Sequence, residues 1–137
     1  MTYGALASTQ LVQGGRWEEA LARASAEIAA MPDEPEAHFN RAQALAALSR
    51  WGEAVADYEA ALRLDASASA LDPAAVDDEL FSALRSLALT QKADPARAHA
   101  TLARYRQLLP QGRHLDDLVT WDDHIDGVEA VWYRDRV

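Results

Sequence analysis

The stretches Gly15-Arg16-Trp17-Glu18-Glu19-Ala20 and Ser49-Arg50-Trp51-Gly52-Glu53-Ala54 repeat one phrase at two places in the chain. The two tryptophans are 34 residues apart, which is the period of a repeat made of two helices and a turn. Because such a unit leaves an apolar face that only a neighbouring unit can cover, the units stack on one another. The phrase therefore predicts an all-α fold of antiparallel helix pairs, whose usual role is to present a binding surface.

The clearest unit follows the first phrase, in residues 35–66. Apolar or small residues recur at helical spacing over residues 35–48, which predicts its first helix. After a break at residues 49–50, one apolar face over residues 51–64 predicts the second helix. This unit is expected to be one complete helix pair.

This unit resembles the tetratricopeptide repeat (TPR), whose motif has a large residue and then a small one in its first helix, an aromatic at the turn, and a small-aromatic-small pattern in its second helix. The residues here that match the motif are His38, Ala42, Leu45, Trp51, Ala54, Tyr58 and Ala61. Ala66 stands where the family has proline. Small residues let two helix axes approach closely, and Trp51 and Tyr58 are expected to fill the space between repeats. The resemblance implies a TPR-like α-solenoid.

Two further repeats are predicted with weaker matches. Residues 2–34 resemble a degenerate first repeat, and residues 76–110 resemble a third one. A small-residue stretch at 66–75 interrupts the period and is expected to be an inserted loop. Helices are predicted over 76–90 and 95–109, and all repeats are expected to belong to one domain over residues 1–137.

The last part of the chain, residues 114–135, is predicted to be a seventh helix that docks on residues 95–109 and caps the stack. Its apolar stripe includes Leu118, Val119, Ile125 and Trp132. Its outer face is expected to be kept wet by Asp117, Asp122, Asp126 and Glu129. A stack that ended earlier would leave apolar surface bare, so a capping helix is expected.

Composition limits the classes of partner. Acidic residues outnumber basic ones 22 to 13, and the formal net charge is -9, which argues against nucleic acid and makes a basic peptide or protein the electrostatically favoured partner. There is no cysteine, so disulfides and thiolate zinc sites are excluded. No segment has the length and apolarity to span a bilayer, and residues 1–10 lack a leader pattern, so a cytoplasmic protein is the default expectation.

Few residues suggest catalysis. The fingerprints of serine hydrolases, zinc proteases, P-loops and dinucleotide-binding folds do not occur. The stretch 122–127 resembles the start of a calcium loop, but His124 and Tyr133 stand where oxygen ligands are required. His114 and Asp117 are interpreted, like His124, as solvated residues of the cap helix. A non-enzymatic protein without metal or cofactor is therefore expected.

The TPR resemblance implies a concave groove lined by the first helix of each repeat. Carried over position by position, the groove residues are Leu6, Thr9, Glu36, Phe39, Asn40, Gln43, Ser82 and Ser86. Phe39 would be an apolar anchor, while Asn40 and Gln43 can bracket a peptide amide with paired donors and acceptors.

One subclass of the family binds the terminal carboxylate of heat-shock chaperones with lysines, an arginine and asparagines. Asn40 matches one of these places, but Ala5 and Thr9 stand where a Lys and an Asn would be, so this chain lacks the cations that offset desolvation of a carboxylate. The favoured hypothesis is a monomeric adaptor that binds a peptide or partner-protein segment in the groove. The alternative is a small acidic secretion-type chaperone for one client, and a metal-dependent enzyme that uses the His and Asp residues of the cap is a remote third.

Overall fold

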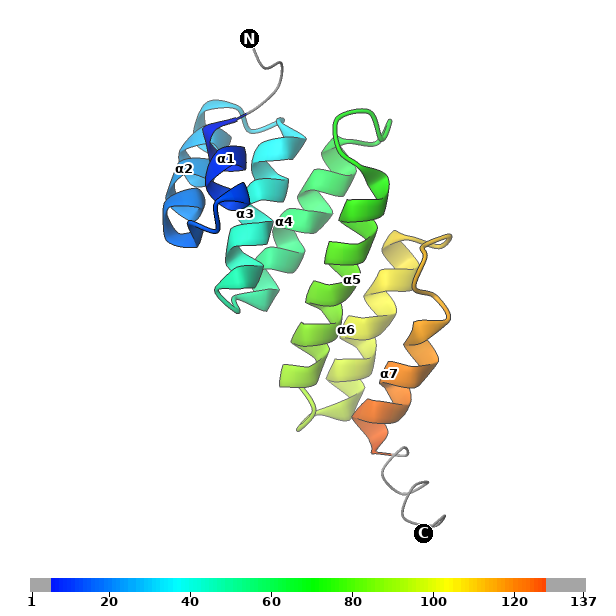
Figure 1. Cartoon of the computed structure of the whole chain (residues 1–137). Coiled ribbons are helices and arrows are strands. Elements are labelled where there is room, and N and C mark those ends of the chain that lie inside the picture. The colour runs from blue at the N-terminus through cyan, green and yellow to red at the C-terminus, as the bar shows by residue number, and fades with distance from the viewer. Residues whose placement is uncertain (1–5, 128–137) are drawn as a thin grey trace. The chain divides into compact units, whose positions relative to one another are not determined.

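The computed structural model describes residues 6–127, and within this range the chain is all-α (Figure 1). The helices are α1 (Ala7–Gln13), α2 (Trp17–Ala30), α3 (Pro35–Ala47), α4 (Trp51–Leu64), α5 (Pro73–Thr90), α6 (Pro95–Leu108) and α7 (Asp117–Asp126). The chain forms two compact units, Met1–Leu80 and Phe81–Val137, whose boundary lies inside α5. The bounds of the predicted repeats and of a single domain stay predictions.

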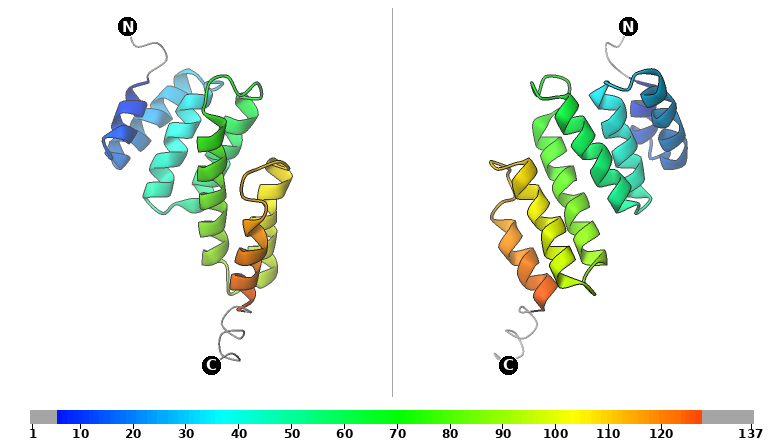
Figure 2. Two further views of the ribbon diagram at one scale, coloured as in Figure 1. Left: turned by 45° about the vertical axis from the view of Figure 1, so that its right-hand side comes forward. Right: turned by 180° about the vertical axis from the view of Figure 1, so that it is seen from behind.

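In the first unit α3 is the central helix, because it packs against α1, α2 and α4 (Figures 1 and 2). The core of this unit is rich in alanine. The alanines with 0% exposure are Ala20, Ala24, Ala37, Ala42, Ala44, Ala54 and Ala61. Ala42 and Ala54 are buried, as expected for positions at which small side chains let helix axes approach closely.

The turns before α2 and α4 have nearly the same geometry. Gly15 and Ser49 have φ values of 70° and 60°, and the following N–H groups of Arg16 and Arg50 donate to carbonyl oxygens five residues earlier, at 2.9 and 2.8 Å. The backbone angles of Arg16 and Arg50 differ by only a few degrees. The left-handed residue and its following bond end each helix in the same way, so turn geometry repeats with the sequence period.

The two aromatic residues predicted to fill the space between repeats, Trp51 and Tyr58, differ in burial. Tyr58 is buried at 2% exposure, as predicted, whereas Trp17 and Trp51 are only partly buried. Trp51 starts α4 and keeps part of its ring in solvent. Its removal is therefore expected to cost less than the loss of a fully buried ring.

We expect Ala54→Leu to lower the free energy of unfolding by about 1–3 kcal/mol, because three extra carbons must enter a fully packed site. Ala26→Leu is the matched control, since Ala26 is an exposed residue of α2 and should change stability by less than about 0.5 kcal/mol. Urea denaturation followed by circular dichroism measures both. Equal effects would contradict the close contact at Ala54.

The connection between α4 and α5 is shorter than the predicted loop at 66–75, because α5 already begins at Pro73. Proline suits the first turn of a helix, where its missing N–H is not needed, and the Asp72 carboxylate accepts from the N–H of Ala74 at 3.1 Å. Asp65 orders the connection by accepting from the N–H groups of Ser69, Ala70 and Leu71 at 3.0–3.1 Å. The loop prediction is therefore wrong at its end.

In the second unit the side chain of Tyr105 is the centre of the packing. It is 0% exposed, its ring meets the edge of Phe81 at 5.1 Å, and its hydroxyl accepts the N–H of His114 at 3.0 Å. Gly112 lies so close that a Cβ there would be 2.2 Å from the Tyr105 hydroxyl oxygen. The segment between α6 and α7 therefore requires glycine at this position.

Helix α7 packs against α6, as predicted for the cap (Figure 2). Leu118 and Ile125 are buried, whereas Val119 is 63% exposed and does not belong to the buried stripe. The side chains of Asp122 and Asp126 are 44% and 47% exposed, as expected for a solvated face, and both carboxylates also contact His99 of α6, which the sequence did not predict. Gly127, with φ 74°, ends the helix, and the predicted continuation to residue 135, with Trp132, lies outside the described residues.

Candidate functional site

Three of the predicted groove residues of the first unit, Thr9 on α1 and Glu36 and Asn40 on α3, are joined by hydrogen bonds. Thr9 donates to Glu36 at 3.1 Å, and the Asn40 amide donates to Thr9 and Ser8 at 2.9 and 2.8 Å. The Ser8 N–H donates to the buried carboxylate of Glu27 at 3.1 Å, and the Ser8 hydroxyl donates to the same group. The first N–H groups of a helix have no partner within the helix, and the N-cap residue Leu6 provides no side-chain acceptor. Glu27 of α2 therefore accepts the Ser8 N–H.

Asn40 does not fit its predicted role as a peptide contact. Its side chain is 2% exposed, and its amide nitrogen donates to two hydroxyls of α1. A buried amide whose hydrogens are both bonded inside the fold has none left for a ligand. Asn40 therefore joins α3 to α1, and its position in the TPR motif does not show that α1 covers it.

The other predicted residues of this region are partly exposed: Leu6, Thr9, Glu36, Phe39 and Gln43. Glu36, Phe39 and Gln43 share one side of α3 by their spacing, and Thr9 bonds to Glu36. We call the surface formed by these four residues the α1–α3 face. Leu6 directly precedes α1 as its N-cap residue.

Each α3 residue of the α1–α3 face is fixed by a neighbour. The Phe39 ring meets Tyr58 edge-on at 5.7 Å. Gln43 donates to one oxygen of Glu79 at 2.9 Å, and the Tyr58 hydroxyl donates to the other oxygen at 2.9 Å. Burial, together with the Glu79 carboxylate, raises the pKa of Tyr58, so its phenol remains a donor. The α1–α3 face is therefore held in one arrangement.

Glu36 is the acidic group of the α1–α3 face. Partial burial raises the pKa of its carboxyl, the hydrogen bond from Thr9 opposes this, and the nearby charges of Glu34 and Glu27 raise it further. A carboxylate in such a place gains from an added positive charge, which would favour its ionised form. The electrostatics of this face therefore suit a cationic group of a partner.

Ser82 and Ser86, the predicted groove residues of the third repeat, belong to the second unit. Both are partly exposed on α5, and the Ser82 hydroxyl accepts a long hydrogen bond of 3.4 Å from Arg85. That Ser82 and Ser86 line one groove together with the α1–α3 face stays a prediction.

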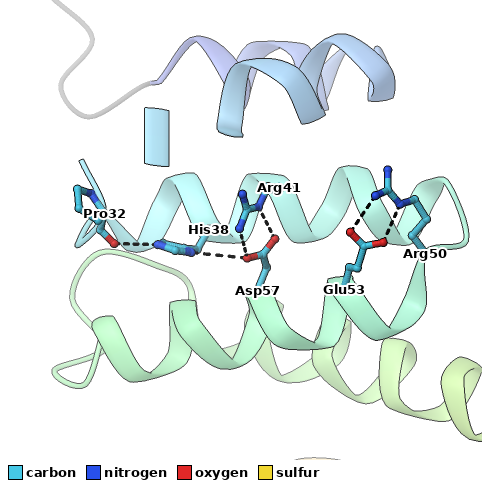
Figure 3. A network of polar contacts seen from close by, with 6 residues as sticks. All are labelled: Pro32, His38, Arg41, Arg50, Glu53 and Asp57. Atoms are coloured by element: carbon cyan, nitrogen blue, oxygen red, sulfur yellow. Dashed lines mark hydrogen bonds and ion pairs between the residues drawn. The ribbon is translucent and has the colours of Figure 1, made fainter. Parts of the chain in front are cut away.

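Sequence reasoning missed an open pocket of about 460 Å³ bounded by α2, α3 and α4. Its lining residues are Leu21, Ser25, Arg41, Leu45, Arg50, Glu53, Ala56 and Asp57. Arg41 donates to both oxygens of the buried Asp57 at 2.6 and 2.9 Å, and Arg50 donates to Glu53 at 2.8–2.9 Å (Figure 3). Each charged lining group thus faces an opposite charge, so the pocket is polar but electrically balanced.

His38 extends the network around Asp57. One ring nitrogen, Nε2, lies 2.8 Å from the Pro32 carbonyl oxygen, and the other, Nδ1, lies 3.6 Å from Asp57 (Figure 3). The hydrogen bond to Asp57 is the largest cause that raises the pKa of Arg41, so the guanidinium stays charged. These contacts of His38 and Arg41 with Asp57 link α3 to α4.

Most arginines of residues 6–80 are already paired with carboxylates. The pairs are Arg16–Glu19, Arg23–Glu27, Arg41–Asp57 and Arg50–Glu53. Acidic residues outnumber arginines in this part of the chain, so a surplus of negative charge remains on the first unit. Such a field attracts cationic partners and speeds their association.

The histidines considered as metal ligands have other contacts. His114 stacks on Phe81 at 4.5 Å and pairs with Asp117 at 3.2 Å, while His124 meets the edge of Trp121 at 5.5 Å. His114 and His124 are therefore partly packed within the second unit, whereas the sequence analysis interprets them as solvated.

Comparisons with known proteins find no matching family model, no matching curated protein and no matching solved structure. Among the described residues, no helix combines the length and apolarity that crossing a membrane requires.

Proposed function

We propose that this chain is a non-catalytic interaction module of the TPR type that binds a segment of a partner protein on the α1–α3 face. The observation that carries the proposal is the row Glu36, Phe39 and Gln43, whose side chains are partly exposed and yet each held by a neighbour. Side chains fixed before binding lose less conformational entropy when a partner orders them. The repeated turn geometry before α2 and α4 supports the TPR assignment.

The chemistry of the α1–α3 face favours a partner segment with a basic residue beside an apolar one. Phe39 offers an aromatic edge and face, Gln43 offers an amide, and Glu36 offers a carboxylate destabilised by burial and by like charges. A Lys or Arg side chain near Glu36 would relieve that like-charge repulsion. The surplus negative charge of the first unit would speed the encounter, so association should slow as salt rises.

We expect the double substitution Phe39→Ala with Gln43→Ala to weaken partner binding about tenfold or more, because an aromatic anchor and an amide contact are lost together. Affinity capture from the native lysate identifies the partner, and calorimetry on the purified pair then gives the dissociation constant. Salt dependence of the association rate reports on the charge of the partner.

Leu21→Ala is the matched control. Leu21 is partly buried, and it lines the open pocket bounded by α2, α3 and α4, not the α1–α3 face. This variant should leave the dissociation constant unchanged. Loss of binding in Leu21→Ala with retention in the double variant would move the site to the pocket. A partner that is soluble only when co-expressed with this chain would favour the chaperone alternative.

A further inference from the structure

His99 of α6 lies between two carboxylates of α7. Its Nδ1 is 2.6 Å from Asp122 and its Nε2 is 2.6 Å from Asp126. A neutral imidazole carries one N–H and can donate to one acceptor, whereas the imidazolium donates from both nitrogens. Two short contacts to two carboxylates therefore require the charged ring.

The groups that face His99 can be named element by element. On α6, the positions one turn away are Pro95, Ala96, Leu102 and Ala103, which carry no charge. On the part of α5 in the second unit the charged residue is Arg85, whose guanidinium lies over the rings of Trp121 and Phe81 at 5.0 and 5.8 Å. On α7 the groups in contact are the carboxylates of Asp122 and Asp126. These two carboxylates set the charge of the ring.

We propose that His99 is a pH-dependent latch that fastens α7 to α6. In the protonated state the ring bridges Asp122 and Asp126, which lie one turn apart on α7 and repel one another without it. When the ring loses its proton, one carboxylate loses its donor and the repulsion returns. Helix α7 then loosens over its buried residues Leu118 and Ile125. The latch is independent of the binding proposed for the α1–α3 face.

The direction of the effect follows from the contacts. The hydrogen bonds to Asp122 and then Asp126 raise the pKa of His99 above its ordinary value of 6.5, and the slight burial opposes them. A pKa raised in the docked state means that the ring stabilises docking fully below about pH 6.5, and that this stabilisation is lost as pH rises through the raised value. Docking of α7 therefore weakens on the alkaline side.

The test combines two measurements on the full chain: the titration of the His99 ring by NMR, and hydrogen exchange of the α7 amides corrected for the intrinsic effect of pH, with α3 as internal reference. We expect the His99 titration above 6.5, and a fall in α7 protection as pH passes it. The protection factor of the α7 amides should fall about tenfold for each unit by which the pKa of His99 is higher with α7 docked than with α7 undocked. In His99→Gln, α7 protection should no longer depend on pH.

Asp123→Asn is the matched control, because it removes one charge from an exposed position of the same helix and should leave the pH dependence intact. Asp122→Asn should lower the His99 pKa, and this readout remains usable if His99→Gln does not fold. An α7 protection that depends on pH equally in wild type and His99→Gln would overturn the latch. A His99 that titrates at or below 6.5 would overturn it as well.

Discussion

Tyr105→Ala is expected to lower the free energy of unfolding by about 3–5 kcal/mol, a large part of the roughly 5–15 kcal/mol that stabilises a typical domain. The ring is fully buried, packs on the edge of Phe81 and occupies the space that Gly112 leaves open. Alanine would leave a cavity bounded by α5, α6 and the segment before α7. Urea denaturation followed by circular dichroism measures the loss.

Tyr105→Phe separates the ring from its hydroxyl. It keeps the packing and removes the acceptor of the His114 N–H, so we expect a loss of about 1–3 kcal/mol for the unsatisfied donor. If Tyr105→Ala were as stable as the wild type, the ring would not be the centre of the second unit. A phenylalanine variant as unstable as the alanine variant would assign the stabilisation to the hydrogen bond instead.

Arg41→Met is expected to cost about 3–5 kcal/mol, because it leaves the carboxylate of Asp57 buried without its bidentate partner. Methionine is similar in length to the arginine stem, so the loss reflects charge more than packing. The remaining neighbour, His38 Nδ1, lies 3.6 Å from the carboxylate. Chemical denaturation at neutral pH gives the change.

The double variant Arg41→Met with Asp57→Leu closes the mutant cycle. Replacement of both partners removes the buried charge, so it should recover much of the stability lost in Arg41→Met. If Arg41→Met alone costs less than about 1 kcal/mol, Asp57 is better hydrated than its burial indicates.

The start of a helix can be predicted from the sequence where the residue at that position is compatible with only one local structure. The first turn at Pro95 and the starts of α3 and α4 were predicted at the residues where they occur. The start of α5 was not, because the sequence analysis places Pro73 in a loop. Proline is compatible with either a loop or a first turn, and the local sequence does not distinguish them.

The candidate site was predicted less well than the helices, because helical spacing shows which residues share a side but not what covers that side. Phe39, Glu36 and Gln43 are partly exposed as expected for contact residues, whereas Asn40, one position from Phe39, is buried under α1. Asp122 and Asp126 share a side of α7, but that side turned out to face His99. A charged stripe on a helix can be solvated and still contact a partly exposed side chain of the next helix, and helical spacing does not identify that side chain.

The sequence by itself determined the helical class, the repeated turn and the burial of Ala42 and Ala54, because these follow from local spacing and side-chain size. Only the tertiary structure decided which polar side chains meet. Arg41 and Asp57 form a bidentate contact between α3 and α4, yet the positions one period earlier are Ala7 and Arg23, so the repeat contains no signal for the pair. Its formation depends on how far each helix is rotated about its axis and how closely the axes approach, and both are set by packing of the whole unit.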